Sequence, residues 1–170
     1  YYFKKEIQGL FHAWMPWAKT RSKEDFSLGL NLLVATLPIV LVGLLVSDLT
    51  ESRSANTNSI AWANLVFAGL LYAAFKSSTQ SKSLTELTLF AALIIGCFQA
   101  LAVFPGASRS GMAITGALII GLNIKDTSRF AFLLSIPTIL GALILMLVKG
   151  AYAIALSDML IMLTGFFGSA

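Results

Sequence analysis

Long runs of apolar residues without charge restrict this chain to folds that suit a lipid environment. Leu28 to Ser47 spans 20 residues with no charged side chain, and Phe130 to Val148 is a second such run. A helix rises about 1.5 Å per residue, so roughly 20 residues cross the ~30 Å hydrocarbon core of a bilayer. The chain is 57% hydrophobic and only 12% charged, with a mean hydropathy of +0.82, which is outside the usual balance of a soluble domain. The sequence therefore predicts an all-α, polytopic membrane protein.

Two further apolar runs complete the predicted membrane domain. Ile60 to Phe75 is shorter, and Trp62 and Tyr72 near its ends are typical of residues at a membrane–water interface. Met159 to Ala170 begins another apolar run that stops with the sequence, which also opens without an initiator methionine. We expect residues 1–170 to form one integral membrane domain that is a fragment of a longer protein and lacks an amino-terminal repeat.

Residues 1–24 predict an interfacial, cytoplasmic segment rather than a further span. The only histidine, His12, lies in it without a partner at a telling distance, so we give it no catalytic role. Cys97 is the only cysteine, which excludes a disulfide framework and a thiolate metal cluster. Four apolar side chains of the segment share one helical face: Ile7, Leu10, Phe11 and Trp14.

The region from Leu87 to Gly121 does not fit two full membrane crossings. Its first leg, Leu87 to Val103, has 17 residues, and its second leg, Ala107 to Gly121, has 15 and would rise only about 22 Å as a helix. Pro105 and Gly106 interrupt the helical pattern between the legs. These lengths favour a re-entrant helical hairpin over residues 87–121. Its turn is expected to face a cavity, because irregular backbone within a membrane must be covered by protein or by water.

The distribution of positive charge favours this hairpin slightly over a single crossing. With the N-terminus inside, the hairpin topology puts nine lysines and arginines on the cytoplasmic side and two outside, whereas a single crossing gives eight against three. The turn then opens toward the outer face. The cytoplasmic flanks account for the net charge of +4, so no nucleic acid partner is expected. The nine residues are Lys4, Lys5, Lys19, Arg21, Lys23, Lys76, Lys82, Lys125 and Arg129.

Arg109 stands in the turn of this hairpin, between Ser108 and Ser110. An arginine within a membrane costs at least ~2.5 kcal/mol, so it needs a partner or a ligand. Its guanidinium matches phosphate or carboxylate oxygens two at a time. If the second leg is helical from about Ala107, the free N–H groups and the helix dipole point to the same place, where the hydroxyls add donors. The pattern predicts an anion site that favours phosphate. The alternative is a structural hairpin in which Arg109 pairs with a carboxylate.

Two spacings predict how the hairpin is held in place. Ala113, Ala117 and Gly121 recur every four residues, which is the small-residue face that lets membrane helices approach closely. Asn123 and Asp126 resemble a capping box, which predicts that the helix over Phe130 to Val148 begins somewhat earlier.

The stretch GCFQALAVFPGASRSGMAITGALIIGL, followed by FLLSIPTILGA, resembles the undecaprenyl-diphosphate phosphatases, the bacitracin-resistance protein family of bacterial inner membranes. The agreement is best from about Gly96 to Ala142. The resemblance implies a multi-pass enzyme that hydrolyses undecaprenyl diphosphate at the outer face and recycles the lipid carrier for cell-wall synthesis. A divalent cation, Mg²⁺ or Ca²⁺, is implied as cofactor. The implied partners are the polyprenyl diphosphate and membrane lipid, and the resemblance leaves a homodimer open.

The resemblance also implies a role for each matching residue of the turn. Arg109 would clamp the diphosphate and stabilise the transferred phosphoryl group, and Ser108 would bind phosphate or act as nucleophile. Ser110 would assist them, Gly106 would allow close approach of the backbone, and Gln99 would contact the substrate. No residue of this chain is assigned as a metal ligand.

Two departures from the family pattern qualify this reading. Ala113 stands where the family has threonine, and Thr115 lies two residues further on. The family also carries an amino-terminal motif with two glutamates, a serine-rich turn and a histidine, and no such stretch occurs here. The family is built from inverted repeats, so this chain is expected to hold half of an active site and to be inactive alone. The open alternatives are a transporter or flippase for an anionic substrate and a non-catalytic membrane scaffold.

Overall fold

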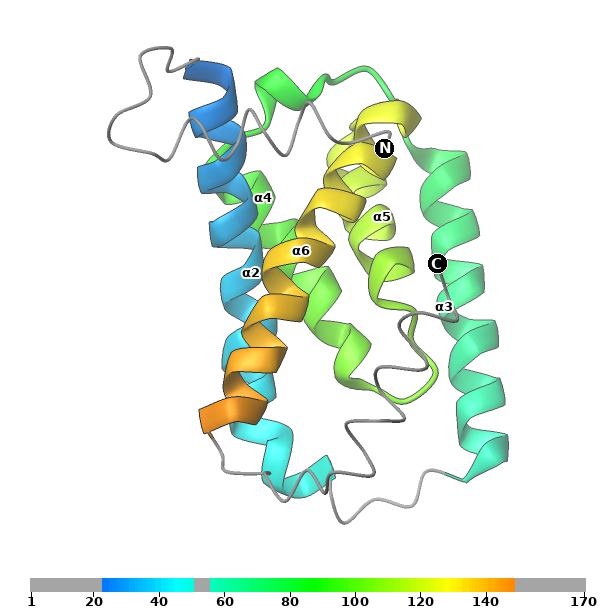
Figure 1. Cartoon of the computed structure of the whole chain (residues 1–170). Coiled ribbons are helices and arrows are strands. Elements are labelled where there is room, and N and C mark those ends of the chain that lie inside the picture. The colour runs from blue at the N-terminus through cyan, green and yellow to red at the C-terminus, as the bar shows by residue number, and fades with distance from the viewer. Residues whose placement is uncertain (1–22, 51–55, 149–170) are drawn as a thin grey trace, which may run out of the picture.

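The computed structural model describes residues 23–50 and 56–148, and these residues form a bundle of helices (Figure 1). No strand occurs within these ranges. The expected interfacial helix near the N-terminus and the apolar run from Met159 lie outside the described residues. In chain order the elements are α2 (Lys23–Thr50), α3 (Thr57–Ser77), η1 (Leu84–Glu86), α4 (Leu89–Ala100), η2 (Leu101–Val103), α5 (Arg109–Ile120) and α6 (Ile124–Val148).

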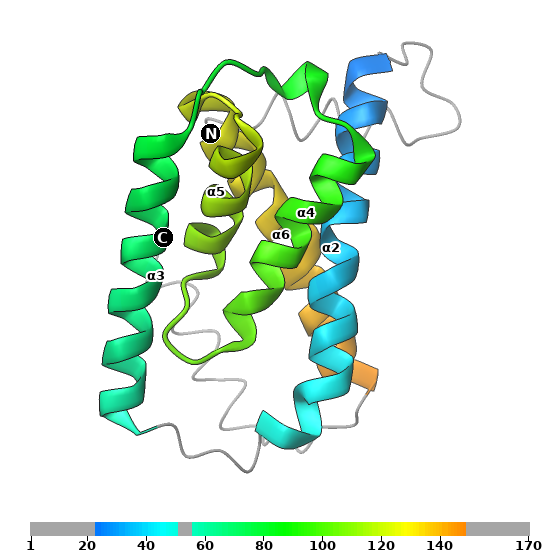
Figure 2. The ribbon, with the colours of Figure 1, turned by 180° about the vertical axis from the view of Figure 1, so that it is seen from behind.

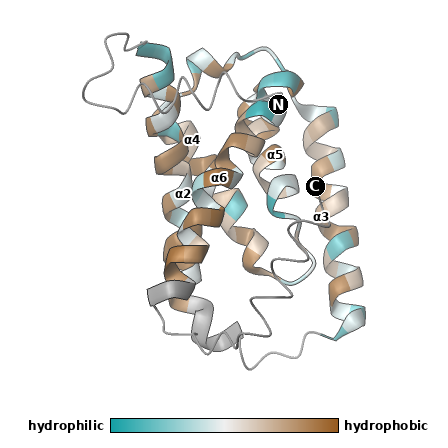
Figure 3. Ribbon diagram, viewed as in Figure 1, coloured by the Kyte–Doolittle hydropathy of each residue, from teal (hydrophilic) through white to brown (hydrophobic). Residues whose placement is uncertain are grey.

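Three of these helices are long and apolar enough to cross a membrane, which confirms the prediction of a multi-pass membrane protein. The spans are Lys23–Leu45, Thr57–Ser77 and Ile124–Leu145. The helices that carry these spans, α2, α3 and α6, contain the three runs expected from the sequence and extend them at their N-terminal ends. Figure 3 shows that hydrophobic residues predominate along them. Many of their large apolar side chains are exposed; Trp62 of α3, for example, is 70% exposed. Such a surface suits lipid and not water.

Helices α4 and α5 form an antiparallel hairpin whose two ends lie at the same end of the bundle. Each has 12 residues, so each is about 18 Å long. Figures 1 and 2 show the turn between them ending short of the far ends of α2, α3 and α6. The backbone thus has the shape expected over residues 87–121. Its re-entrant placement in a bilayer stays a prediction.

A network of hydrogen bonds, which we term the hairpin clasp, closes the base of this hairpin. The backbone N–H of Lys82 donates to the carbonyl of Gly121 at 3.0 Å, and the N–H of Asn123 donates back to Lys82 at 2.9 Å. The carboxylate of Asp126 accepts from the N–H of Leu84 at 2.9 Å and from the side-chain amide of Asn123 at 2.8 Å. The N–H of Asp126 donates to Oδ1 of Asn123, so the expected cap is present and α6 begins at Ile124.

The end of the bundle where the hairpin begins and ends is hydrophilic (Figure 3), and five basic residues lie in the elements and loops that meet there. A single crossing by residues 87–121 would put the last two of them at the opposite end, so the grouping is the one that the hairpin topology requires. The other residues of the predicted cytoplasmic set lie outside the described part of the chain. The grouped residues are Lys23, Lys76, Lys82, Lys125 and Arg129.

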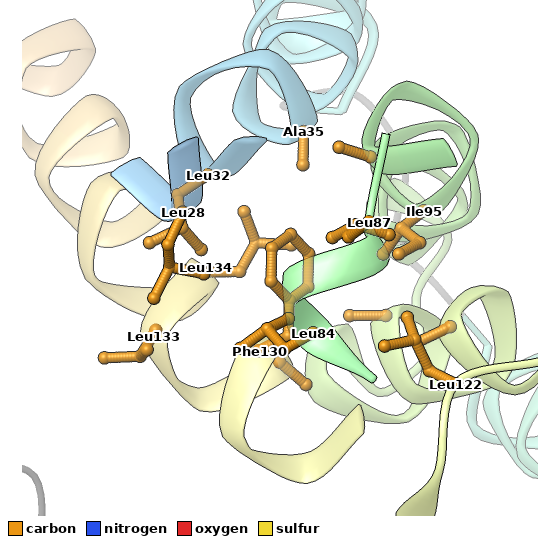
Figure 4. Close-up of a cluster of buried hydrophobic side chains, with 14 residues drawn as sticks. Leu28, Leu32, Ala35, Leu84, Leu87, Ile95, Leu122, Phe130, Leu133 and Leu134 are labelled. Atoms are coloured by element: carbon orange, nitrogen blue, oxygen red, sulfur yellow. The ribbon is translucent and has the colours of Figure 1, made fainter. Parts of the chain in front are cut away.

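The core lies between α2, α4, α5 and α6, with Phe130 fully buried within it (Figure 4). Ala113 and Ala117 are buried there, as their spacing predicts. The prediction that Gly121 continues this helical face is wrong. Helix α5 stops at Ile120, and Gly121 is its C-cap, in the left-handed conformation (φ 92°). Gly116 makes the close approach instead, since a Cβ there would lie 2.9 Å from the Cβ of Phe98 in α4.

Gly96 sets the distance between α4 and α2. A Cβ at this position would overlap the backbone carbonyl of Ala35, and backbone atoms cannot move aside as a side chain can. We expect Gly96→Ala to lower the free energy of unfolding in detergent by about 1–3 kcal/mol, which is typical of overpacking. Gly69→Ala in α3 is the matched control, because its Cβ would meet nothing within 4 Å. Equal stability of the two variants would contradict this account of the helix contact.

Candidate functional site

The turn after α4 places the candidate residues at the N-terminus of α5. Ser108 is the N-cap, and its Oγ accepts a hydrogen bond of 3.2 Å from the N–H of Gly111. Arg109 and Ser110 then occupy the first turn, as expected, whereas Ser108 lies just before it. The Oγ atoms of Ser108 and Ser110 are 3.4 Å apart. Two hydroxyls, a guanidinium and the positive end of a helix dipole therefore lie together.

Arg109 is exposed and has no ion-pair or hydrogen-bond partner among residues 23–50 and 56–148. In the described helices, Glu24 and Asp25 lie at the start of α2, Asp48 lies near its other end, and Glu86 and Asp126 lie at the base of the hairpin. No ion pair of Arg109 in the described part of the chain supports the structural alternative, in which a carboxylate neutralises it.

Gly106 fixes the tip of the hairpin against α3. It has a positive φ of 96°, which residues with a side chain rarely adopt. A Cβ there would lie 2.7 Å from the carbonyl oxygen of Ile60 and 3.2 Å from the Cβ of Ala63. The side of Gly106 that lacks a Cβ therefore faces α3. This contact gives Gly106 a packing role that the sequence did not indicate.

Arg109 lines two openings beside the turn. The first, which we term the Gln99 opening, has a volume of about 420 Å³ and the second, the α2–α6 opening, about 180 Å³. Gly106 lines neither. The Gln99 opening is lined by Gln99, Arg109, Ser110, Ala131, Phe132, Ser135 and Ile139.

Gln99 is a buried polar side chain of the Gln99 opening whose amide oxygen lacks a hydrogen-bond partner. It is 1% exposed, and its Oε1 accepts no hydrogen bond. Burying an amide oxygen without a partner costs about 1–3 kcal/mol. A ligand or an ordered water in the opening, beside Arg109 and Ser110, would remove this cost.

Two further hydroxyls, those of Ser135 and Thr115, complete the description of the site. Ser135 of α6 lines the Gln99 opening, and its hydroxyl donates to the carbonyl of Phe132. We assigned it no role from the sequence, although a hydroxyl within an apolar helix is a usable signal. Thr115 does not replace the hydroxyl missing at Ala113, because it is buried and donates to the carbonyl of Gly111 at 2.8 Å.

The described residues do not fit a site for Mg²⁺ or Ca²⁺. Within them no group of three His, Cys, Asp or Glu side chains lies close enough to hold a metal, and these cations prefer several oxygen ligands with carboxylates among them. Around Arg109 the available oxygens belong to hydroxyls and one amide, and the guanidinium itself repels a cation.

In the part of the chain that the structure describes, the fold and the site define a multi-pass, helical membrane protein with an arginine that has no partner there at the start of a short hairpin helix. The whole chain, residues 1–170, matches the family described as bacitracin resistance protein BacA. The chain belongs to this family, as the resemblance of the hairpin sequence predicted.

Curated relatives of the chain carry the name undecaprenyl-diphosphatase. The protein from Saccharophagus degradans is 43% identical over 138 residues, which cover 81% of this chain and 52% of the relative. The protein from Teredinibacter turnerae is 42% identical over 139 residues, 81% of this chain and 53% of the relative. The protein from Alcanivorax borkumensis is 42% identical over 142 residues, which cover 84% of this chain and 54% of the relative. The chain thus spans about half the length of these relatives, whose names do not favour the transporter alternative.

The cap at Ser108 generates a test of how the turn is built. Ser108→Ala removes the acceptor for the N–H of Gly111, so we expect the free energy of unfolding to fall by about 1 kcal/mol. Ser110→Ala removes a neighbouring hydroxyl that does not cap the helix, and its effect is expected within about 0.5 kcal/mol. Denaturant titration of both variants in detergent measures the difference. A loss at Ser110 as large as that at Ser108 would contradict the assigned cap.

Proposed function

We propose that this chain takes part in the hydrolysis of undecaprenyl diphosphate to undecaprenyl phosphate and inorganic phosphate, which recycles the lipid carrier for cell-wall synthesis. The observation that supports the proposal most is Arg109 at the N-terminus of α5, which has no ion-pair or hydrogen-bond partner among the described residues. A cation and free N–H groups at one point favour a phosphate ligand. The substrate itself is suggested by the names of the relatives.

Arg109 and the start of α5 would bind the diphosphate oxygens. The first N–H groups of a helix have no intrahelical partner, and Ser108 already occupies that of Gly111. The N–H groups of Arg109 and Ser110 are therefore available to the substrate. Positive charge and donors aimed at the phosphoryl oxygens stabilise the charge on them in the transition state.

Ser108 is better suited to bind phosphate than to attack it. A serine nucleophile needs a base to accept its proton, and in the described part of the chain the Oγ of Ser108 contacts the hydroxyl of Ser110 and the N–H of Gly111 instead of a histidine or carboxylate. Its Oγ accepts from Gly111 while its own O–H can still donate to a phosphate oxygen. Water is then the nucleophile, and it cleaves the bond between the bridging oxygen and the terminal phosphorus.

The base that accepts the proton of this water is expected on a facing segment. The family resemblance implies a glutamate pair and a histidine in an amino-terminal half, and these would also supply ligands for a divalent cation. Mg²⁺ or Ca²⁺ dependence is therefore part of the proposal for the natural protein, and no step assigned to the described residues passes through a metal.

The proposed location is the bacterial inner membrane, with the site open to the outer face. Positive residues of membrane proteins collect on the cytoplasmic side. Five basic residues gather at the base of the hairpin, and the turn with Arg109 points away from them (Figures 1 and 3). This orientation would let a lipid diphosphate reach Arg109 from the outer leaflet.

Substitution of Arg109 tests the proposed function directly. We expect Arg109→Ala to lower kcat for release of phosphate from undecaprenyl diphosphate by about 100-fold or more, as removal of a transition-state donor does in other enzymes. Arg109→Lys keeps the charge but loses the paired donors, so it should retain an intermediate rate. The assay uses the purified natural protein in detergent with Mg²⁺ or Ca²⁺.

The control for Arg109 is Lys76→Ala, which removes an exposed cation at the other end of the bundle. It should leave the rate within about twofold, since exposed charges contribute little. Absence of phosphate release from folded natural protein, together with uptake of a phosphorylated substrate into vesicles, would refute hydrolysis in favour of transport.

Gln99 offers a second test, with opposite expectations for activity and stability. Gln99→Leu removes an amide whose Oε1 has no partner, so the free energy of unfolding should stay equal or rise. If the amide contacts the substrate or the attacking water, kcat/KM should fall by about 2–10-fold, the value of one neutral hydrogen bond. Phosphate release and denaturant titration on the same preparation give both numbers. Loss of stability with unchanged kcat/KM would assign Gln99 a structural role only.

A further inference from the structure

The α2–α6 opening differs in chemistry from the Gln99 opening, although Arg109 lines both. It lies between α2 and α6, against η2 and the first residue of α5. Its polar side chains are Arg109 and Thr138, and the hydroxyl of Thr138 donates to the carbonyls of Leu134 and Ser135. Apart from the guanidinium, the wall therefore offers apolar contact: Ile39, Val40, Gly43, Ala102, Val103, Gly141, Ala142 and Leu145.

Small residues keep this opening free of protein. Gly43 of α2 and Gly141 of α6 lie on its two walls. A Cβ at Gly43 would meet nothing within 4 Å, and a Cβ at Gly141 would meet only Cγ2 of Val40, at 3.5 Å. Helix packing therefore does not require either glycine. A larger side chain at these positions would occupy the opening without displacing the backbone.

The combination of one cation and an apolar wall selects an amphiphilic anion. A charged group bound at Arg109 lies at the edge of the apolar wall, so an apolar chain attached to it can continue between α2 and α6. A cavity of about 180 Å³ is many times the ~10–15 Å³ that one water needs, and an apolar cavity is a poor site for water.

We propose that the α2–α6 opening holds the first isoprenoid units of the lipid diphosphate, while the diphosphate lies at the Gln99 opening. Arg109 then marks the boundary between head group and chain, and its side chain orients the substrate as well as binding it. This inference rests on the proposed function for its ligand. It adds which wall of the site recognises the lipid.

Filling the opening tests the inference. The Gly141→Leu substitution is made in the natural protein, which is then purified in detergent. Gly69→Leu is the matched control, because Gly69 faces open space on α3. Binding is measured for undecaprenyl diphosphate and for inorganic pyrophosphate, which shares the two phosphates but has no chain. We expect Gly141→Leu to weaken lipid binding at least fivefold and to leave pyrophosphate binding within twofold. Gly69→Leu should change neither.

Several outcomes would overturn the inference. Unchanged lipid binding by Gly141→Leu would mean that another segment of the natural protein fills the opening, and equal weakening of both ligands would indicate general distortion of the site. Gly141→Ala, with a methyl group 3.5 Å from Val40, should give a smaller loss in the same direction and covers the case in which the leucine variant does not fold. Phosphate release is recorded separately. If the wild-type protein binds the lipid but releases no phosphate, the proposed hydrolysis is refuted. The binding data for Gly141→Leu and Gly69→Leu still test the inference in that case.

Discussion

The structure depends on a positive charge that is held at the end of a short helix with no ion-pair partner among the residues that the structure describes. Arg109 begins α5, and the hairpin brings it into the bundle between the spanning helices instead of leaving it at an end. In such surroundings a charge is costly, and its cost falls only when an anion comes to it. The packing of the hairpin serves to keep this charge in place while its anion is absent.

The hairpin is fixed at both ends and in the middle, by different interactions. At its base the hairpin clasp joins Lys82 to Gly121 and Asn123 by backbone hydrogen bonds. At mid-length Gly96 allows α4 to touch the backbone of α2, and at the tip Gly106 packs on α3. Three fixed points leave the turn little freedom. Donors that are rigid before the substrate arrives need no reorganisation when charge develops, which is the condition for effective electrostatic stabilisation.

Features set by neighbouring residues were predictable from the sequence, whereas those that bring together residues from different helices were not. Hydropathy located the three spans, the short legs with Pro105 and Gly106 located the hairpin, and the Asn123–Asp126 spacing located the start of α6. The small-residue spacing wrongly extended the helical face to Gly121. Spacing alone does not show where a helix ends, and a glycine just past that end serves as its cap. The contact of Gly106 with α3 and the meeting of Gln99, Arg109 and Ser135 from three helices depend on tertiary packing. No local pattern encodes which helices become neighbours.

The described residues of the site supply hydrogen-bond donors and positive charge but no general base. The Gln99 opening is lined by hydrogen-bond donors and a cation, with the buried Oε1 of Gln99 as an acceptor, and neither a carboxylate nor a histidine is among its described lining residues. Donors can bind a diphosphate and stabilise negative charge, but they cannot accept the proton of an attacking water. In-line displacement at phosphorus requires the nucleophile and the leaving oxygen on opposite sides of the transferred group. If the hairpin holds the phosphate oxygens from its own side, the base must approach from a facing segment, which an inverted repeat would place there by symmetry.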